Sequence, residues 1–69
     1  MSAVTIVANG EDRRISEGTT VGGLLEILGM PAGRVAVEHN GAILPRERYA
    51  DTLLAAGDRI EVVTLVGGG

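Results

Sequence analysis

The stretch TVGGLLEILGMP at residues 20–31 sets the architecture of this chain, because it marks where a helix begins and ends. Thr19 or Thr20 is suited to cap the first turn of the helix. Gly29 suits the position just after the last turn, and Pro31 prevents continuation. Between these ends, apolar residues recur at helical spacing. They are Val21, Leu24, Leu25 and Leu28, with Ile27 widening the stripe. We therefore predict one amphipathic helix of about three turns.

Two glycines stand inside this helix. Gly22 and Gly23 each cost about 1 kcal/mol relative to alanine in a helix, so we expect them to serve packing, by letting the helix approach a sheet closely. Because they lie within the helix rather than in a loop between a strand and a helix, they do not form a phosphate-binding loop.

The segment before the helix predicts a β-hairpin. The apolar run at residues 4–8 ends at Asn9-Gly10, a dipeptide that tolerates the positive φ of a tight turn. Residues 13–16 then form the partner strand, with the two arginines facing solvent.

The segment after the helix predicts further strands. Residues 34–38 read as a mostly buried strand, and His39-Asn40-Gly41 as a turn. Residues 42–44 are a short strand that Pro45 confines to an edge or to its end. Residues 46–57 are rich in turns, and three apolar side chains there are expected to pack under a loop. They are Tyr49, Leu53 and Leu54.

The last strand is predicted at residues 59–65, after the turn at Gly57-Asp58. Its β-branched run favours a central place in the sheet. Side chains alternate between the two faces of a strand. Ile60, Val62 and Thr64 therefore share one face, and Glu61, Val63 and Leu65 share the other.

These elements predict an α+β fold of the β-grasp type, in which a mixed sheet of four or five strands packs on one main helix. The crossover from the first hairpin through the helix to a later strand is expected to be right-handed. We expect residues 1–66 to form this domain and residues 67–69 to form a flexible glycine tail.

Composition excludes several classes of protein. The 69 residues suffice for one domain and contain no cysteine, so disulfides and thiolate metal ligands are excluded. The formal charge is −3, with both signs scattered and a single aromatic residue, which argues against a nucleic-acid partner. No targeting leader and no run long enough to cross a membrane is seen. We therefore expect a soluble, cytoplasmic protein with no membrane partner.

No set of residues predicts catalysis or metal binding. His39 is the single histidine and stands beside a turn, where we expect it to be solvated. Glu38, Asp51, Asp58 and Glu61 are expected to be solvated carboxylates. No Cys, His, Asp or Glu residues have the spacing of a metal site. We therefore expect a protein that is not an enzyme and binds no cofactor.

The remaining feature is the end of the sequence, Gly67-Gly68-Gly69. Glycine brings no apolar surface to offset the entropy lost on ordering, so such a tail should be mobile and thin. The segment from Val66 onward extends about 13 Å when stretched, which is enough to carry the last carboxylate into a partner's active site. Adenylation by ATP would activate that carboxylate, and a sulfur nucleophile could then convert it into a thiocarboxylate. A frayed tail or an expression scar is the competing interpretation of the glycine run.

The run GDRIEVVTLVGGG at residues 57–69 resembles the C-terminal signature of the ThiS family, the sulfur carriers of thiamine biosynthesis. Further similarities follow in order along the chain. They are Asn9-Gly10-Glu11, Thr20-Val21 leading into Leu24-Leu25, Val35-Ala36-Val37-Glu38, Asn40-Gly41 and Leu44-Pro45-Arg46.

This resemblance implies a ubiquitin-like β-grasp fold and a set of partners. A ThiF-like adenylyltransferase would activate Gly69 with ATP and magnesium, and a cysteine desulfurase or another persulfide donor would supply sulfur. Thiazole synthase would receive that sulfur. Gly69 would then be the residue that is adenylated and thiocarboxylated, and Gly67 and Gly68 would form the stem that enters the partner active sites.

The alternation of the last strand adds a docking hypothesis. Val63 and Leu65 are expected to be exposed next to the tail and, with Val66, to contact a partner; packing under a loop or in a homodimer is the competing interpretation. Three other functions remain open: the small subunit of molybdopterin synthase, a ubiquitin-like protein modifier, and a passive ubiquitin-like binding module.

Overall fold

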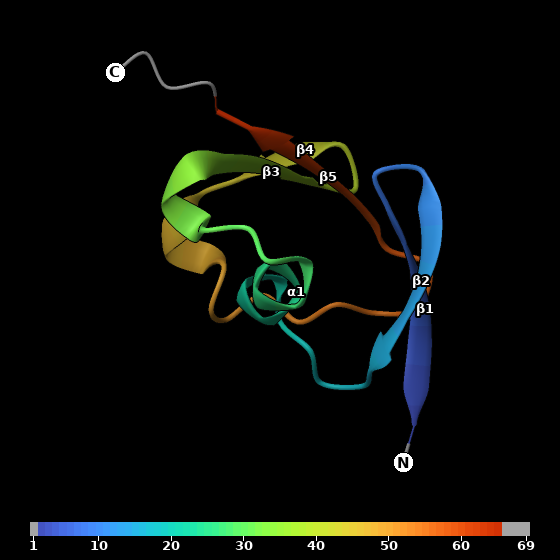
Figure 1. The fold of residues 1–69 in the computed structure, drawn as a ribbon. Helices are drawn as coiled ribbons and strands as arrows, with labels where there is room; N and C mark the ends of the chain where they lie inside the picture. The colour runs from blue at the N-terminus through green and yellow to red at the C-terminus, as the bar shows by residue number, and fades with distance from the viewer. Residues whose placement is uncertain (1, 66–69) are drawn as a thin grey trace.

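The computed structural model of the chain describes residues 2–65. These residues form a mixed sheet of five strands, one α-helix and two short 3₁₀ helices (Figure 1). In chain order the elements are β1 (Ala3–Ala8), β2 (Glu11–Ser16), α1 (Val21–Leu28), η1 (Ala32–Arg34), β3 (Val35–His39), β4 (Ala42–Leu44), η2 (Arg46–Arg48) and β5 (Arg59–Thr64).

The strands are arranged in the order β2-β1-β5-β3-β4. The hairpin partners β1 and β2 are antiparallel, as are β3 and β4, and β5 lies between the two hairpins. It runs parallel to β1 and antiparallel to β3. The predictions of a mixed sheet and of a central last strand are therefore confirmed.

The core lies between α1 and one face of the sheet (Figure 1). Val21 and Leu24 of the helix are fully buried, as are Ile6 of β1 and Ile60 of β5. The remaining buried side chains come from the same two layers and from the segment before β5. They are Ala8, Ile15, Leu25, Val35, Val37, Tyr49, Leu54 and Val62. This sheet packed on one helix is the β-grasp arrangement that the sequence predicts.

The helix begins and ends at the predicted cap residues, but its eight residues make about two turns rather than the predicted three. The Thr20 Oγ1 accepts a hydrogen bond of 3.0 Å from the Gly23 N–H, which identifies Thr20 as the N-cap. The Thr19 hydroxyl instead donates to the carbonyl of Ser16 at 2.6 Å. Gly29 follows the helix with a φ of 72°, a left-handed conformation that glycine adopts without steric cost.

The segment from η2 to residue 54 crosses the N-terminal end of α1, and this corrects the prediction for Gly22 and Gly23. The amides of Val21 and Gly22 donate to the carbonyls of Thr52 and Tyr49, each at 2.9 Å. A Cβ added at Gly22 would lie 3.5 Å from the Tyr49 carbonyl oxygen. The close approach at Gly22 is therefore to this segment, and the neighbours of Gly23 are the side chains of Thr19 and Thr20, so neither glycine serves an approach of the helix to the sheet.

Three burial predictions are also corrected. Leu53 is 63% exposed, because the chain there is extended and its buried neighbour Leu54 takes the inner side. Ile27 is 55% exposed, because the short helix packs through a narrower stripe. The strand β3 alternates between buried Val35 and Val37 and exposed residues, because only one face of the sheet is covered. Tyr49 and Leu54 are buried as predicted.

Within residues 2–65, no helix has the length and hydropathy needed to span a membrane.

Candidate functional site at the end of the last strand

Two Asn-Gly turns hold the beginning of β5 from both sides. Asn9 and Asn40 both have positive φ, 51° and 52°. The Asn9 N–H donates to the Ile60 carbonyl at 2.9 Å, and its Oδ1 accepts from the Val62 N–H at 2.7 Å. On the other side, the Asn40 N–H donates to the Arg59 carbonyl and its Oδ1 accepts from the Arg59 N–H, both at 2.8 Å. These four bonds fix the register of the strand.

At its other end, β5 leads out of the sheet beside the start of β3. Thr64 pairs with Val35, and the Leu65 N–H donates to the Arg34 carbonyl at 2.8 Å. The tail residues predicted to carry the chemistry, Gly67, Gly68 and Gly69, lie outside the described residues, as does Val66 of the predicted docking set. Their roles stay predictions.

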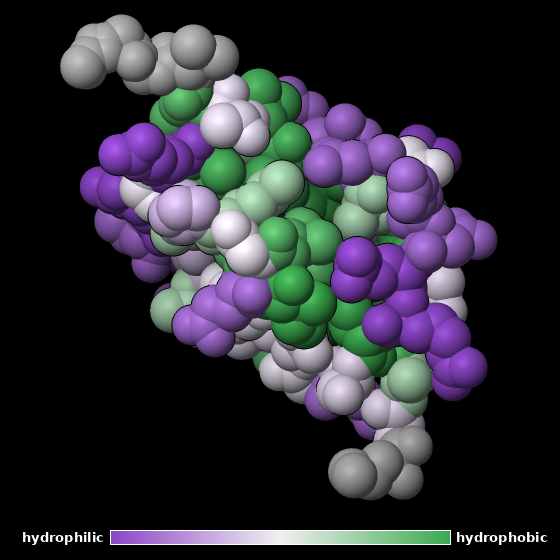
Figure 2. Space-filling view, viewed as in Figure 1, coloured by the Kyte–Doolittle hydropathy of each residue, from purple (hydrophilic) through white to green (hydrophobic). Residues whose placement is uncertain are grey.

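The face of the sheet away from α1 carries exposed apolar side chains next to this exit. Val63 is 57% and Leu65 is 51% exposed, which confirms that they are accessible on the face opposite Ile60 and Val62. Ile43 of β4, whose exposure the sequence does not predict, is 77% exposed. Figure 2 looks nearly along α1 rather than onto this outer face, and it shows apolar residues in a band that passes over α1, bordered by hydrophilic ones. The docking role of Val63 and Leu65 stays a prediction.

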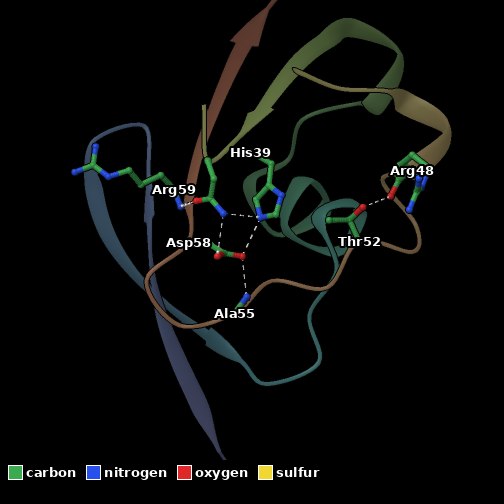
Figure 3. A network of polar contacts seen from close by, with 7 residues as sticks. His39, Arg48, Thr52, Ala55, Asp58 and Arg59 are labelled. Carbon is green, nitrogen blue, oxygen red and sulfur yellow. Dashed lines mark hydrogen bonds and ion pairs between the residues drawn. The ribbon is translucent and has the colours of Figure 1, made fainter. Parts of the chain in front are cut away.

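His39 is not the solvated turn residue that the sequence predicts. It is the last residue of β3, its side chain is only 23% exposed, and its Nε2 donates to Asp58 Oδ2 at 2.9 Å (Figure 3). Asp58 also accepts from the Ala55 N–H at 2.9 Å and from Asn40 Nδ2 at 3.3 Å. This network could not be predicted from local sequence patterns, because His39 and Asp58 are 19 positions apart in the chain.

The network shifts the acidity of Asp58. Burial alone would raise its pKa, since the side chain is only 15% exposed. The hydrogen bonds from Ala55, His39 and Asn40 outweigh that effect and lower the pKa below 3.8. Asp58 is therefore a structural acceptor that ties the end of β3 to the entry of β5, and the prediction that it is merely solvated is wrong.

A hollow of about 570 Å³ lies between α1, η1 and the segment after η2. Its walls are mostly small and apolar residues, with Glu26 and Arg46 as the charged ones. Within residues 2–65, no three His, Cys, Asp or Glu side chains come together in a way that could hold a metal ion.

Comparison with known proteins points to one family. The model of the ThiS family matches residues 4–69. The crystal structure of the thiamine biosynthesis protein ThiS from Geobacter metallireducens superposes with a TM-score of 0.82 and 33% identity, covering 96% of this chain and all of that one. A ycf40 protein of Pyropia yezoensis is 40% identical over 68 residues, covering 99% of this chain and 96% of that protein.

Two further relatives are much longer. A thiazole synthase of Paramagnetospirillum magneticum is 44% identical over 64 residues, which is 93% of this chain and 20% of that protein. A thiazole synthase of Magnetococcus marinus is 46% identical over 61 residues. This chain thus spans about one-fifth of the length of these two relatives.

The family match extends over nearly the whole sequence, and the fold agrees with that of a solved member at 33% identity. The chain belongs to the ThiS family.

Proposed function

We propose that this chain is a sulfur carrier of thiamine biosynthesis, which delivers sulfur for the thiazole ring as a thiocarboxylate on Gly69. It is the substrate of an adenylyltransferase rather than an enzyme itself, and it binds no cofactor of its own. The proposal places the reaction in the cytoplasm, because the thiols that take part in the sulfur transfer stay reduced there.

The observation that carries this proposal is the family match, which continues through Gly69. A match confined to the core of the domain would support only a shared fold. The thiazole synthases support the receiving partner, because a segment similar to nearly all of this chain belongs to a polypeptide of that name. We therefore propose thiazole synthase as the acceptor of the sulfur.

The chemistry proceeds in two stages. A ThiF-like adenylyltransferase, using ATP and magnesium, joins the Gly69 carboxylate to AMP and releases pyrophosphate. A persulfide from a cysteine desulfurase or another donor then attacks the activated carbonyl and displaces AMP. A second thiol cleaves the resulting S–S bond, which leaves the thiocarboxylate on Gly69 and a disulfide on the donor.

The described structure supports the delivery of the tail. The bonds from Asn9 and Asn40 hold the beginning of β5, and buried Ile60 and Val62 anchor its middle. A partner that contacts exposed Val63 and Leu65 would therefore find a rigid surface beside the stem formed by Gly67 and Gly68. Rigid docking surfaces lose less entropy on binding.

Intact-mass spectrometry tests the proposal. The purified chain is incubated with the adenylyltransferase, ATP, magnesium, a cysteine desulfurase and cysteine. We expect a mass increase equal to the exchange of one oxygen for one sulfur, located by fragmentation on the last residue. The protein that carries the thiocarboxylate should then transfer its sulfur to thiazole synthase and not to the large subunit of molybdopterin synthase.

The controls omit ATP or use a chain that ends at Val66 and so lacks all three terminal glycines, and neither should gain mass. An unchanged mass of the complete chain under the full conditions contradicts the proposal. Covalent adducts with other proteins that depend on Gly69 would instead indicate a protein modifier.

A further inference from the structure

Two glutamates stand directly opposite each other on the exposed face of the sheet. The antiparallel register pairs Glu38 of β3 with Glu61 of β5, and both residues are exposed. Directly opposite side chains have Cβ atoms about 4.5–5.5 Å apart, and like charges at that separation destabilise a sheet. This pair therefore weakens the free domain.

The described residues do not compensate this repulsion with an ion pair. The ion pairs among residues 2–65 are His39 with Asp58 and Arg48 with Asp51, and neither includes Glu38 or Glu61. Arg59 is on the same strand face as Glu61, two positions earlier, yet it forms no ion pair with it. The two carboxylates thus meet solvent with their charges unpaired within this part of the chain.

Apolar side chains border the glutamates on both sides. Ile43 stands opposite Glu38 on β4 and is 77% exposed, while Val63 follows Glu61 on the same face of β5 and is 57% exposed. A partner that covers these apolar side chains also takes the two carboxylates out of water. Such desolvation is unfavourable unless the partner supplies an opposite charge. The surface therefore selects a partner that combines apolar contacts with a cation.

We propose that Glu38 and Glu61 together receive one arginine or lysine side chain of thiazole synthase when that enzyme docks on the exposed face of β5, β3 and β4. This inference rests on the proposed function and names the charge that its acceptor must present. A guanidinium can donate to two carboxylates at once, and such charge-assisted bonds are strong. The repulsion in the free domain is then relieved only in the complex.

The test measures stability and binding on the same variants. We expect Glu38→Gln and Glu61→Gln each to raise the melting temperature of the free domain by about 1–5 °C. The same variants should weaken binding to purified thiazole synthase, measured by isothermal titration calorimetry, by about tenfold. The double variant should lose less than the product of the two effects, because one cation serves both residues.

A substitution that reverses the charge separates the effect on melting temperature from the effect on binding to thiazole synthase. Glu61→Arg places opposite charges across the strands, so the domain should melt at a higher temperature than the wild type. Binding should fall by about a hundredfold or more, because two like charges now face each other in the interface. Glu17→Gln is the matched control, since it removes one exposed carboxylate away from this face. It should change neither quantity.

Each outcome bears on the inference. If the wild type binds thiazole synthase and both glutamine variants bind equally well, the inference is overturned while the proposed function stands. If both variants melt at a lower temperature, the pair is not repulsive and the inference is again overturned. If the wild type neither binds thiazole synthase nor delivers sulfur to it, the proposed function fails, and this inference fails with it.

Discussion

A single carboxylate, Asp58, connects three parts of the chain that meet at the entry of β5. It accepts hydrogen bonds from the Ala55 amide, from His39 of β3 and from Asn40 in the turn after β3. An ionised carboxylate has no proton to donate and acts only as an acceptor, so the charged form of Asp58 satisfies all three donors. The lowered pKa of Asp58 is the consequence, and it links the stability of the fold to pH.

We expect Asp58→Asn to lower the free energy of unfolding by about 1–3 kcal/mol at neutral pH, because the amide nitrogen faces other donors. The folded-state pKa of Asp58 lies below the ordinary value of 3.8. The stabilisation by its charge is therefore complete above that value and is lost as the pH falls through the folded-state pKa. Urea unfolding at a series of pH values should show the two proteins converging in acid.

The control is Asp51→Asn, which alters an exposed ion pair with Arg48 and should change stability little at any pH. A difference between Asp58→Asn and the wild type that stays constant into strong acid would show that the charge of Asp58 is not its source.

Asn40 contributes both a backbone conformation and a side chain. Its φ is 52°, and its Oδ1 accepts from the Arg59 N–H. Asn40→Gly keeps the conformation but loses the side-chain bonds, so we expect a loss of about 1 kcal/mol. Asn40→Ala loses both the tolerance of positive φ and the side-chain hydrogen bonds, so we expect the free energy of unfolding to fall by about 2–3 kcal/mol. Denaturant unfolding measures the order; equal losses for glycine and alanine would contradict the contribution of positive φ.

Within β5, neighbouring side chains point to opposite faces of the sheet, one into the core and the next into solvent. Val62 is buried at 7% exposure and packs in the core, while the next residue, Val63, is 57% exposed. The strand thus presents one face to the fold and the other to solvent. Since these residues are identical in type, a substitution at each compares the two faces of one strand directly.

We expect Val63→Asp to keep the fold, with a loss of about 1 kcal/mol from reduced β-propensity, and to slow adenylation by the adenylyltransferase about tenfold. Val62→Asp buries a charge in the core and should unfold the domain. Circular dichroism reports folding, and pyrophosphate release reports adenylation. Unfolding of Val63→Asp would refute the docking role of this side chain.

The elements that local signals define could be predicted from the sequence. The helix has a threonine cap and a glycine end, and the hairpin has Asn9-Gly10, so each is determined by residues that are close in the chain. The exposure of Val63 follows from strand alternation in the same way. The pairing of Glu38 with Glu61 and the bond from His39 to Asp58 could not be predicted, because each depends on a register between distant segments.

Leu53 is predicted to pack under a loop and Ile27 to widen the apolar face of the helix, yet both side chains are exposed. Apolarity does not reveal which side of an extended segment faces inward when the segment crosses a helix end, as residues 52–54 do. The roles of Gly67, Gly68 and Gly69 rest on the sequence and the family match, since they lie outside the described residues.

For the molecule as a whole, the fold and the proposed chemistry occupy different residues. Every buried side chain of the described core lies between Ile6 and Val62, whereas the proposed reaction takes place on Gly69. Glycines add no apolar surface to a core. The domain should therefore fold and dock without the tail, and a chain without the tail should compete with the complete one.

We expect a chain ending at Val66 to melt within about 2 °C of the complete chain and to fail to rescue a thiamine auxotroph. The docking face of the shortened chain is intact. An excess of the shortened chain should therefore slow sulfur transfer to thiazole synthase from the complete chain that carries the thiocarboxylate. Adding Val63→Asp to the shortened chain should remove this inhibition, which separates docking from chemistry. Rescue by the chain ending at Val66 would show that the terminal glycines do not carry the sulfur.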